Sequence, residues 1–213
     1  MPVKRSSRAV ILTELTLSDD LLPWNPLEFG LTGFVRPLLK QTQLENRKLQ
    51  VVYDANKHGY NGRAFHEKVD GKGASVVLAK VSGKWIGGYN PRGWASLGGS
   101  RPSVAAFVFQ KTLLGWEKMR VKGRGGMACG RDEYNTGIFF GAEALCAPLD
   151  GSDPRGIYSR LGSYYDPSAG GKYTLLPRAG EQLRMSELYV ISGVYKAGEI
   201  IPNSGGVTDL GLY

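Results

Sequence analysis

The chain has 213 residues, of which 42% are hydrophobic, and its 27 Lys and Arg outnumber its 19 Asp and Glu to give a formal net charge of +8. That length is enough for one hydrophobic core, and no run of Pro, Ser or charge divides the chain into two different compositions. No apolar run approaches the roughly 18 residues of a membrane-spanning helix. We therefore expect one domain at residues 27–193, with an N-terminal arm at residues 1–26 and a C-terminal tail at residues 194–213.

The N-terminus and the two cysteines favour a reducing compartment. The basic N-terminus is followed by a stretch too short and too polar for a signal peptide, and then by acidic residues that organelle transit sequences avoid. Cys129 and Cys146 form no Cys-x-x-Cys pair, so they predict neither a zinc site nor a disulfide framework. We expect reduced, packed cysteines in a soluble intracellular protein, for which the cytoplasm is the favoured location and an organelle is the alternative.

Two segments have helical patterns. Residues 27–42 place apolar side chains on one face, and Pro37 is expected to kink this helix or to split it in two. Residues 61–69 form a shorter amphipathic pattern, in which Asn61 can accept a hydrogen bond as the N-cap. We expect this second helix to lie on a sheet with Phe65 facing inward.

Short apolar segments separated by glycines dominate the rest of the chain, which has thirty glycines, about twice the usual share of ~7%. This pattern predicts an antiparallel, mainly β core with many turns. Ser82-Gly83 predicts a two-residue hairpin, because glycine tolerates a positive φ. Residues 103–111 are nearly all apolar at their centre, so we expect them in the middle of the sheet. The predicted strands are residues 50–54, 75–81, 84–89, 103–111, 119–122, 127–131, 138–140, 144–147 and 186–192.

Residues 49–90 resemble the heart of a TLDc domain. The matching features are Tyr53, His58-Gly59, Phe65-His66-Glu67-Lys68, Lys72-Gly73, Val76-Val77-Leu78 and Gly87-Gly88-Tyr89. The resemblance continues in order through residues 103–110, 137–141, 159–165 and 185–190, so that it covers residues 31–193. It implies a β-sandwich of two antiparallel sheets flanked by short helices, which is also what the glycine and strand pattern predicts.

An enzymatic hypothesis has to start from the two histidines, His58 and His66, and from their neighbouring carboxylates, Asp54, Glu67 and Asp70. On a helix, His66 and Asp70 are four residues apart and share a face, whereas Glu67 points elsewhere. One histidine with one or two carboxylates is short of the three ligands of a catalytic zinc, and no Gly-x-Ser-x-Gly nucleophile is present. We expect structural roles for these residues and no metal or cofactor, with a hydrolase-like enzyme using His66 and Glu67 as an alternative.

The resemblance to TLDc proteins implies a non-enzymatic interaction module, which in several members docks on the peripheral part of the vacuolar-type proton ATPase and protects against oxidative stress. A pI near 9.5 favours an acidic partner, such as a negative protein face, an anionic lipid surface or nucleic acid. Tryptophan and arginine are rich in interface energy and loops carry function, so we assign partner binding to residues of the glycine-rich loops. These residues are Arg92, Trp94, Arg101, Trp116, Arg124 and Arg131.

Two further alternatives remain open. Apolar residues in the N-terminal arm and the C-terminal tail are typical of a structural subunit that is held in a large assembly by its arms. Aromatic side chains interleaved with arginines are typical of nucleic-acid binding, although no recognisable RNA-binding or DNA-binding motif accompanies them.

Overall fold

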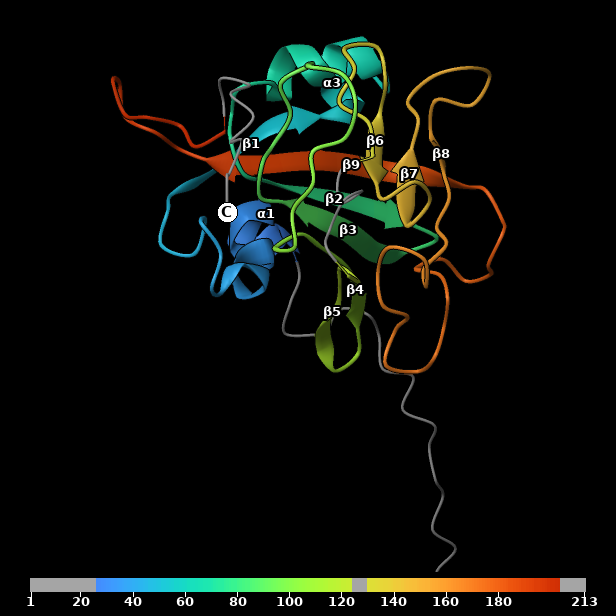
Figure 1. The fold of residues 1–213 in the computed structure, drawn as a ribbon. Helices are drawn as coiled ribbons and strands as arrows, with labels where there is room; N and C mark the ends of the chain where they lie inside the picture. The colour runs from blue at the N-terminus through green and yellow to red at the C-terminus, as the bar shows by residue number, and fades with distance from the viewer. Residues whose placement is uncertain (1–25, 124–129, 204–213) are drawn as a thin grey trace, which may run out of the picture.

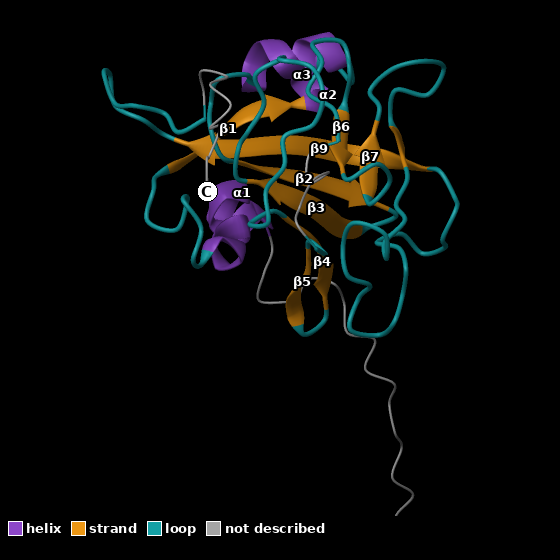
Figure 2. Ribbon diagram, viewed as in Figure 1, coloured by secondary structure: helices purple, strands orange, loops and turns teal. Residues whose placement is uncertain are grey.

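The computed structural model describes residues 26–123 and 130–203. Figure 2 shows short helices and long loops around a twisted sheet. The helical segments are α1 (Pro26–Val35), the 3₁₀ helix η2 (Arg36–Leu39), α2 (Ala55–His58) and α3 (Gly62–Val69). The strands are β1 (Leu49–Asp54), β2 (Ser75–Val81), β3 (Lys84–Asn90), β4 (Phe107–Thr112), β5 (Gly115–Arg120), β6 (Ile138–Phe140), β7 (Leu145–Ala147), β8 (Gly156–Ile157) and β9 (Leu183–Gly193).

The strands form a large antiparallel sheet and a small one. The large sheet has the order β1-β9-β2-β3-β4-β5, with β8 paired to one end of β9, and the small sheet contains β6 and β7. Strand β9 comes last in the chain but lies between β1 and β2, as Figure 1 shows in orange-red. The predicted mainly β fold, with two antiparallel sheets and few short helices, is confirmed.

Both faces of the large sheet are buried. Along β2, Val77 and Ala79 face one core together with α3 and the small sheet, whereas Val76 and Leu78 face a second core beneath α1 and η2. The alternation follows from the two-residue period of a strand. Burial on both faces explains why β2 is apolar almost throughout.

Glycines set the spacing between the two sheets at β3. A Cβ added at Gly88 would lie 2.5 Å from the Phe140 ring of β6, so a larger residue would push the small sheet away. The turn before β3 is as predicted: Ser82 and Gly83 both have a positive φ, at 48° and 77°, and Val81 pairs with Lys84. Hence Gly83 allows the tight turn of this hairpin, and Gly88 allows the small sheet to approach β3 closely.

The two predicted helices form with shorter limits. The first ends at Val35, and Pro37 lies at the start of η2, so the expected split is confirmed. The second begins after Asn61, whose side chain accepts a hydrogen bond from the Ala64 amide at 3.1 Å. Phe65 is fully buried in the core, as expected.

Three strand predictions need correction. Residues 103–106 precede β4 as a loop, and β4 lies next to the edge strand β5 rather than in the middle, a place that β2 takes. The strand predicted at residues 119–122 begins earlier, at Gly115, because it pairs with β4 across a tight turn. Of the strand predicted at residues 127–131, residues 127–129 lie outside the described residues, and residues 130 and 131 are not in a strand.

The part of the tail that the structure describes, residues 194–203, packs back on the domain. The Val194 amide donates to the Lys48 carbonyl at 2.7 Å, and Arg47 pairs with Glu199 at 2.7 Å. The N-terminal arm up to residue 25 lies outside the described residues. Within the described ranges, no helix is long and apolar enough to cross a membrane.

Cys146 on β7 is expected to resist alkylation in the folded protein. It is fully buried, and this burial raises the pKa of its thiol from 9.0 to about 12. Because only the thiolate reacts, its population near pH 8 falls about a thousandfold. The check is the rate of iodoacetamide labelling, measured by mass spectrometry on a Cys129→Ser variant with and without urea. Equal rates in the two conditions would contradict the prediction.

Candidate functional site

The buried face of α3 places two polar side chains together. His66 and Asp70 are one turn apart, and His66 Nδ1 lies 2.7 Å from Asp70 Oδ1. The shared face is therefore confirmed. Glu67 lies on the outer face of the helix, where it accepts hydrogen bonds from Arg63 Nε and from the Tyr134 hydroxyl, both at 3.1 Å.

The long loop between β3 and β4, residues 91–106, closes over this helix face. Ser96 Oγ donates to the Asp70 carboxylate and lies 3.0 Å from His66 Nδ1. Ser96 has a φ of 55°, which is uncommon for a residue with a side chain. Figure 1 shows the loop in light green, running up to α3.

Asp132, from the segment that precedes β6, fastens the same loop. Its carboxylate is fully buried and accepts from the Ala95 amide at 3.0 Å, the Ser96 amide at 3.2 Å and Arg101 Nη1 at 3.1 Å. Arg101 Nη2 donates in turn to the carbonyls of Arg92, at 3.1 Å, and Asn203, at 2.9 Å. We call His66, Asp70, Ser96, Arg101 and Asp132 the loop clasp, since they join α3, the β3–β4 loop and the β6 segment.

The geometry of the loop clasp suits structure better than proton transfer. The His66 side chain is 0% exposed, and both Asp70 and Ser96 approach the same ring nitrogen, Nδ1. Nε2 is buried and has no hydrogen-bond partner among the described residues. A general base must be within reach of the proton that it takes. Hence neither nitrogen of His66 is presented to a substrate.

A metal ion bound near His66 would have to compete with the hydrogen bonds and the ion pair that Asp132 already makes. Ligand atoms of His66, Asp70 and Asp132 lie within 4.8 Å of one another. However, the Asp132 carboxylate already accepts from two backbone amides and from the Arg101 guanidinium, which supplies the neutralising positive charge. Asp132 could not be singled out from the sequence, because it lies 62 positions beyond Asp70 in the chain and no local signal joins the two.

The other histidine, His58, stabilises a turn. His58 ends α2, and its Nδ1 accepts from the Asp54 amide at 3.1 Å. Its ring lies 5.7 Å from the Tyr53 ring, at a tilt of 31°. This contact within a turn is a structural role, as was expected of His58.

The residues predicted to face a partner are scattered by the fold. Trp94 is only 1% exposed and packs in the core, and Arg101 belongs to the loop clasp, so neither is available on the surface. Arg92 and Trp116 are half-buried. Arg131 is exposed, with its guanidinium 5.1 Å from the Phe139 ring centre. Arg124 lies outside the described residues. The glycine-rich loop after β3 is thus folded onto the domain rather than free.

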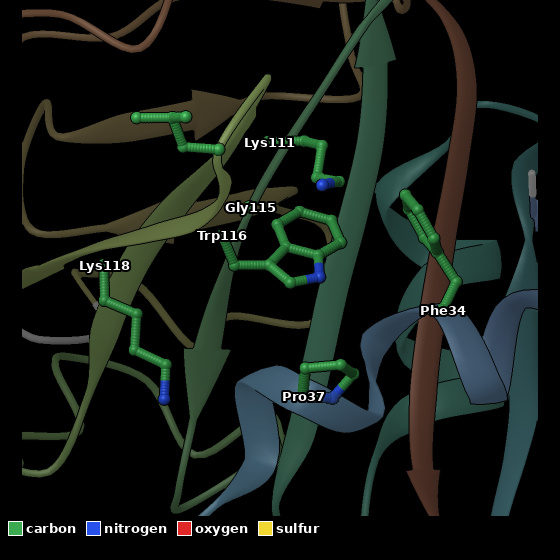
Figure 3. A pocket seen from close by; sticks show the side chains of 7 residues that line it. Phe34, Pro37, Lys111, Gly115, Trp116 and Lys118 are labelled. Atoms are coloured by element: carbon green, nitrogen blue, oxygen red, sulfur yellow. The ribbon is translucent and has the colours of Figure 1, made fainter. Parts of the chain in front are cut away.

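A hollow of about 440 Å³ lies where the β4–β5 hairpin meets α1 and η2. Figure 3 shows the Trp116 indole at its centre, with Phe34 and Pro37 on the helical side. Its lining residues are Phe34, Pro37, Lys111, Leu114, Gly115, Trp116 and Lys118. Desolvation lowers the pKa of Lys111, and desolvation together with the charge of Arg120 lowers that of Lys118. Nothing in the local sequence indicated this hollow, because α1 is remote from the hairpin in the chain.

The profile of one known family matches residues 34–168, more than half of the chain, and that family is the TLDc domain. The chain belongs to the TLDc domain family. The match starts in α1 and stops before β9, yet β9 lies between β1 and β2, so the TLDc sheet continues to Gly193. No curated protein matches the chain.

Proposed function

We propose that this TLDc domain is a non-enzymatic docking module that binds a protein partner through the β3–β4 loop. The observation that carries the proposal is that the loop clasp fastens the loop from beneath while the loop exposes apolar side chains outward. Leu97 is 55% exposed and Val104 is 67% exposed. Buried polar anchors below and apolar side chains above are what a recognition loop on a rigid scaffold requires.

The clasp lowers the entropic cost of docking. Binding by a mobile loop loses affinity because its side chains and backbone must be ordered first. Here Asp132 holds the first half of the loop through the Ala95 amide and the second half through Arg101, whose guanidinium also donates to the Arg92 carbonyl. The surface is thereby ordered before any partner arrives.

A second segment extends the same surface. The Gly98 amide donates to the Asp132 carbonyl at 2.9 Å, which joins the exposed part of the loop to the segment that carries Tyr134. Tyr134 is 40% exposed and lies 5.9 Å from the Arg63 guanidinium. Tyrosine and arginine are among the residues that contribute most to interface energy.

The partner we propose is a large protein complex with an acidic face, such as the peripheral part of the vacuolar-type proton ATPase, in a role linked to protection against oxidative stress. Family membership supports this choice, since the TLDc resemblance implies it. The net charge of +8 also supports it, because it favours encounter with a negative surface. We also propose that the domain catalyses no reaction, which the full burial of the His66 side chain supports.

Leu97→Asp with Val104→Asp is expected to abolish partner capture without unfolding the domain. Both side chains are exposed, so the substitutions change stability by only about 0.5 kcal/mol. A charge in the apolar centre of an interface should weaken binding by roughly a hundredfold, since it is desolvated without a partner. The measurement is affinity purification from the native source, with quantitative mass spectrometry of co-purified proteins.

Ile200→Asp is the matched control, because Ile200 is 87% exposed and belongs to the tail rather than to the loop. It should capture partners as the wild type does. Capture of proton-pump subunits by the wild type and by Ile200→Asp alone fits the proposal. Equal capture by all three proteins would show that the loop is not part of the interface. If no proton-pump subunits are captured at high coverage, the proposed partner is wrong.

A further inference from the structure

The tip of the β4–β5 hairpin presents two adjacent leucines to solvent. Leu113 is 90% exposed and Leu114 is 101% exposed. The turn that carries them is held by Thr112, whose Oγ1 accepts from the Leu114 amide at 3.2 Å and donates to the Gly115 carbonyl at 3.0 Å. One exposed leucine is ordinary, but two at the end of an ordered projection mark an interaction site.

An aromatic side chain and a lysine stand directly behind this tip. Lys111 pairs with Trp116 across the hairpin, and its Nζ lies 5.7 Å from the Trp116 ring centre. The indole packs edge-on against Phe34, at 4.8 Å between ring centres, and against Phe109, at 5.3 Å. Figure 3 shows Lys111 on one side of the indole and Lys118 on the other. The hairpin thus has an apolar tip, formed by Leu113 and Leu114. Behind the tip, Lys111, Trp116 and Lys118 form an aromatic and positively charged region, which we call the shoulder.

Positive charge dominates the shoulder. Residues 107–122 contain four cationic side chains, Lys111, Lys118, Arg120 and Lys122, and a single carboxylate, Glu117. The carboxylate is already engaged, since it accepts from Gln110 Nε2 at 2.7 Å and from the Ala169 amide. Lys118 and Lys122 donate to the backbone carbonyls of Leu38 and Gly162, but none of the four cations forms an ion pair with a carboxylate of the described residues. The excess positive charge therefore calls for an anionic partner surface.

We propose that the β4–β5 hairpin tip docks on an anionic lipid bilayer, with Leu113 and Leu114 entering the acyl boundary and the lysines contacting acidic headgroups. The dimensions agree. At about 3.4 Å per residue, Lys111 and Trp116 lie about 7 Å behind the leucines. Interfacial protein segments bury their apolar side to roughly that depth, and tryptophan prefers the headgroup level.

A bilayer fits this tip better than a protein pocket does. The leucines form a convex projection, and a fluid acyl region accepts a convex apolar group of any shape, whereas a protein would need a matching cavity. Anionic headgroups also place their charge at the level of the shoulder, where each nearby lysine or arginine adds to the attraction. This surface lies on the β4–β5 hairpin and is separate from the β3–β4 loop proposed to bind protein.

The test uses the purified full chain and lipid vesicles alone, so it is independent of any protein partner. We expect the protein to sediment with phosphatidylcholine vesicles that contain roughly a third phosphatidylserine, and to be released by high salt. Leu113→Ser with Leu114→Ser should lower the partition coefficient by about tenfold or more, since the apolar contribution is lost. A Leu114→Trp variant should have its fluorescence quenched by brominated acyl chains.

Ile200→Ser is the matched control, because it removes an equally exposed apolar side chain elsewhere and should leave vesicle binding unchanged. Wild-type binding that is equal with pure phosphatidylcholine would overturn the role of charge. Undiminished binding by the double serine variant would overturn the role of the tip. A wild type that binds neither vesicle, while the double serine variant loses a protein in affinity purification, would show that the tip serves a protein instead.

Discussion

Asp132→Ala is expected to lower the free energy of unfolding by about 3–5 kcal/mol, because it leaves a buried charge without its partner. The Arg101 side chain is 9% exposed, and the Asp132 side chain is 0% exposed. The substitution also removes the acceptor of the Ala95 and Ser96 amides, which costs further free energy. The measurement is urea unfolding at neutral pH, followed by fluorescence and circular dichroism.

Two companion variants separate charge from hydrogen bonding. Asp132→Asn keeps an oxygen that can accept from the Ala95 and Ser96 amides, so it should cost less than Asp132→Ala. Arg101→Met on the Asp132→Ala background should recover part of the lost stability, since the unpaired guanidinium is gone. Full recovery is not expected, because the two amides still lack their acceptor.

Glu133→Ala provides the control for removal of a carboxylate from the same segment. Glu133 is exposed, so its loss should change the free energy of unfolding by about 0.5 kcal/mol or less. If Asp132→Ala costs no more than Glu133→Ala, the clasp does not hold the loop. Docking through the β3–β4 loop should fall together with stability in Asp132→Ala, whereas in the Leu97→Asp and Val104→Asp protein it should fall alone.

Local rules explain why part of this architecture could be predicted from the sequence. The cap at Asn61 depends on a residue and the backbone three positions later, and the Ser82-Gly83 turn depends on two neighbouring φ angles. The pairing of His66 with Asp70 follows from the helical period alone. Each of these features is contained within a few residues, so the sequence pattern was sufficient.

Features that join distant segments could not be predicted in the same way. The clasp needs Asp132 to meet Ser96, and the hollow at the hairpin needs Phe34 to meet Trp116. Residue type was misleading for Trp94, because tryptophan is enriched both at interfaces and in cores. The choice between these two roles depends on which loop folds over α3, and that is settled by long-range packing.

The same logic explains the misplaced central strand. The apolar run at residues 103–109 suggested a strand covered on both faces, and Phe107, Val108 and Phe109 are indeed buried from the two sides. The number of buried faces does not give a strand's place in the sheet, however. Strand β9 from the end of the chain inserts beside β2 and shifts the centre of the sheet away from β4.

Trp94→Ala is expected to destabilise the domain by about 3–5 kcal/mol, comparable to other truncations of buried aromatic residues. The indole packs edge-on against Phe65, at 5.2 Å between ring centres, and faces Phe140 of the small sheet at 6.4 Å. Its removal would leave a cavity between α3 and that sheet, where the backbone cannot collapse freely. The check is again urea unfolding. The free energies of unfolding of the variant and the wild type are compared provided that both depend on urea concentration with the same slope.

Trp94→Phe distinguishes packing from partner recognition. Phenylalanine keeps a ring against Phe65 and removes Nε1, which is buried and has no hydrogen-bond partner among the described residues, so the loss should be clearly smaller than for alanine. Partner capture by Trp94→Phe should then equal that of the wild type, because the side chain is 1% exposed. A folded Trp94→Phe protein that no longer captures its partner would instead place Trp94 at the interface, through a rearrangement of the loop. Leu114→Ala is the opposite case: its side chain is 101% exposed, so stability should be unaffected while vesicle binding falls.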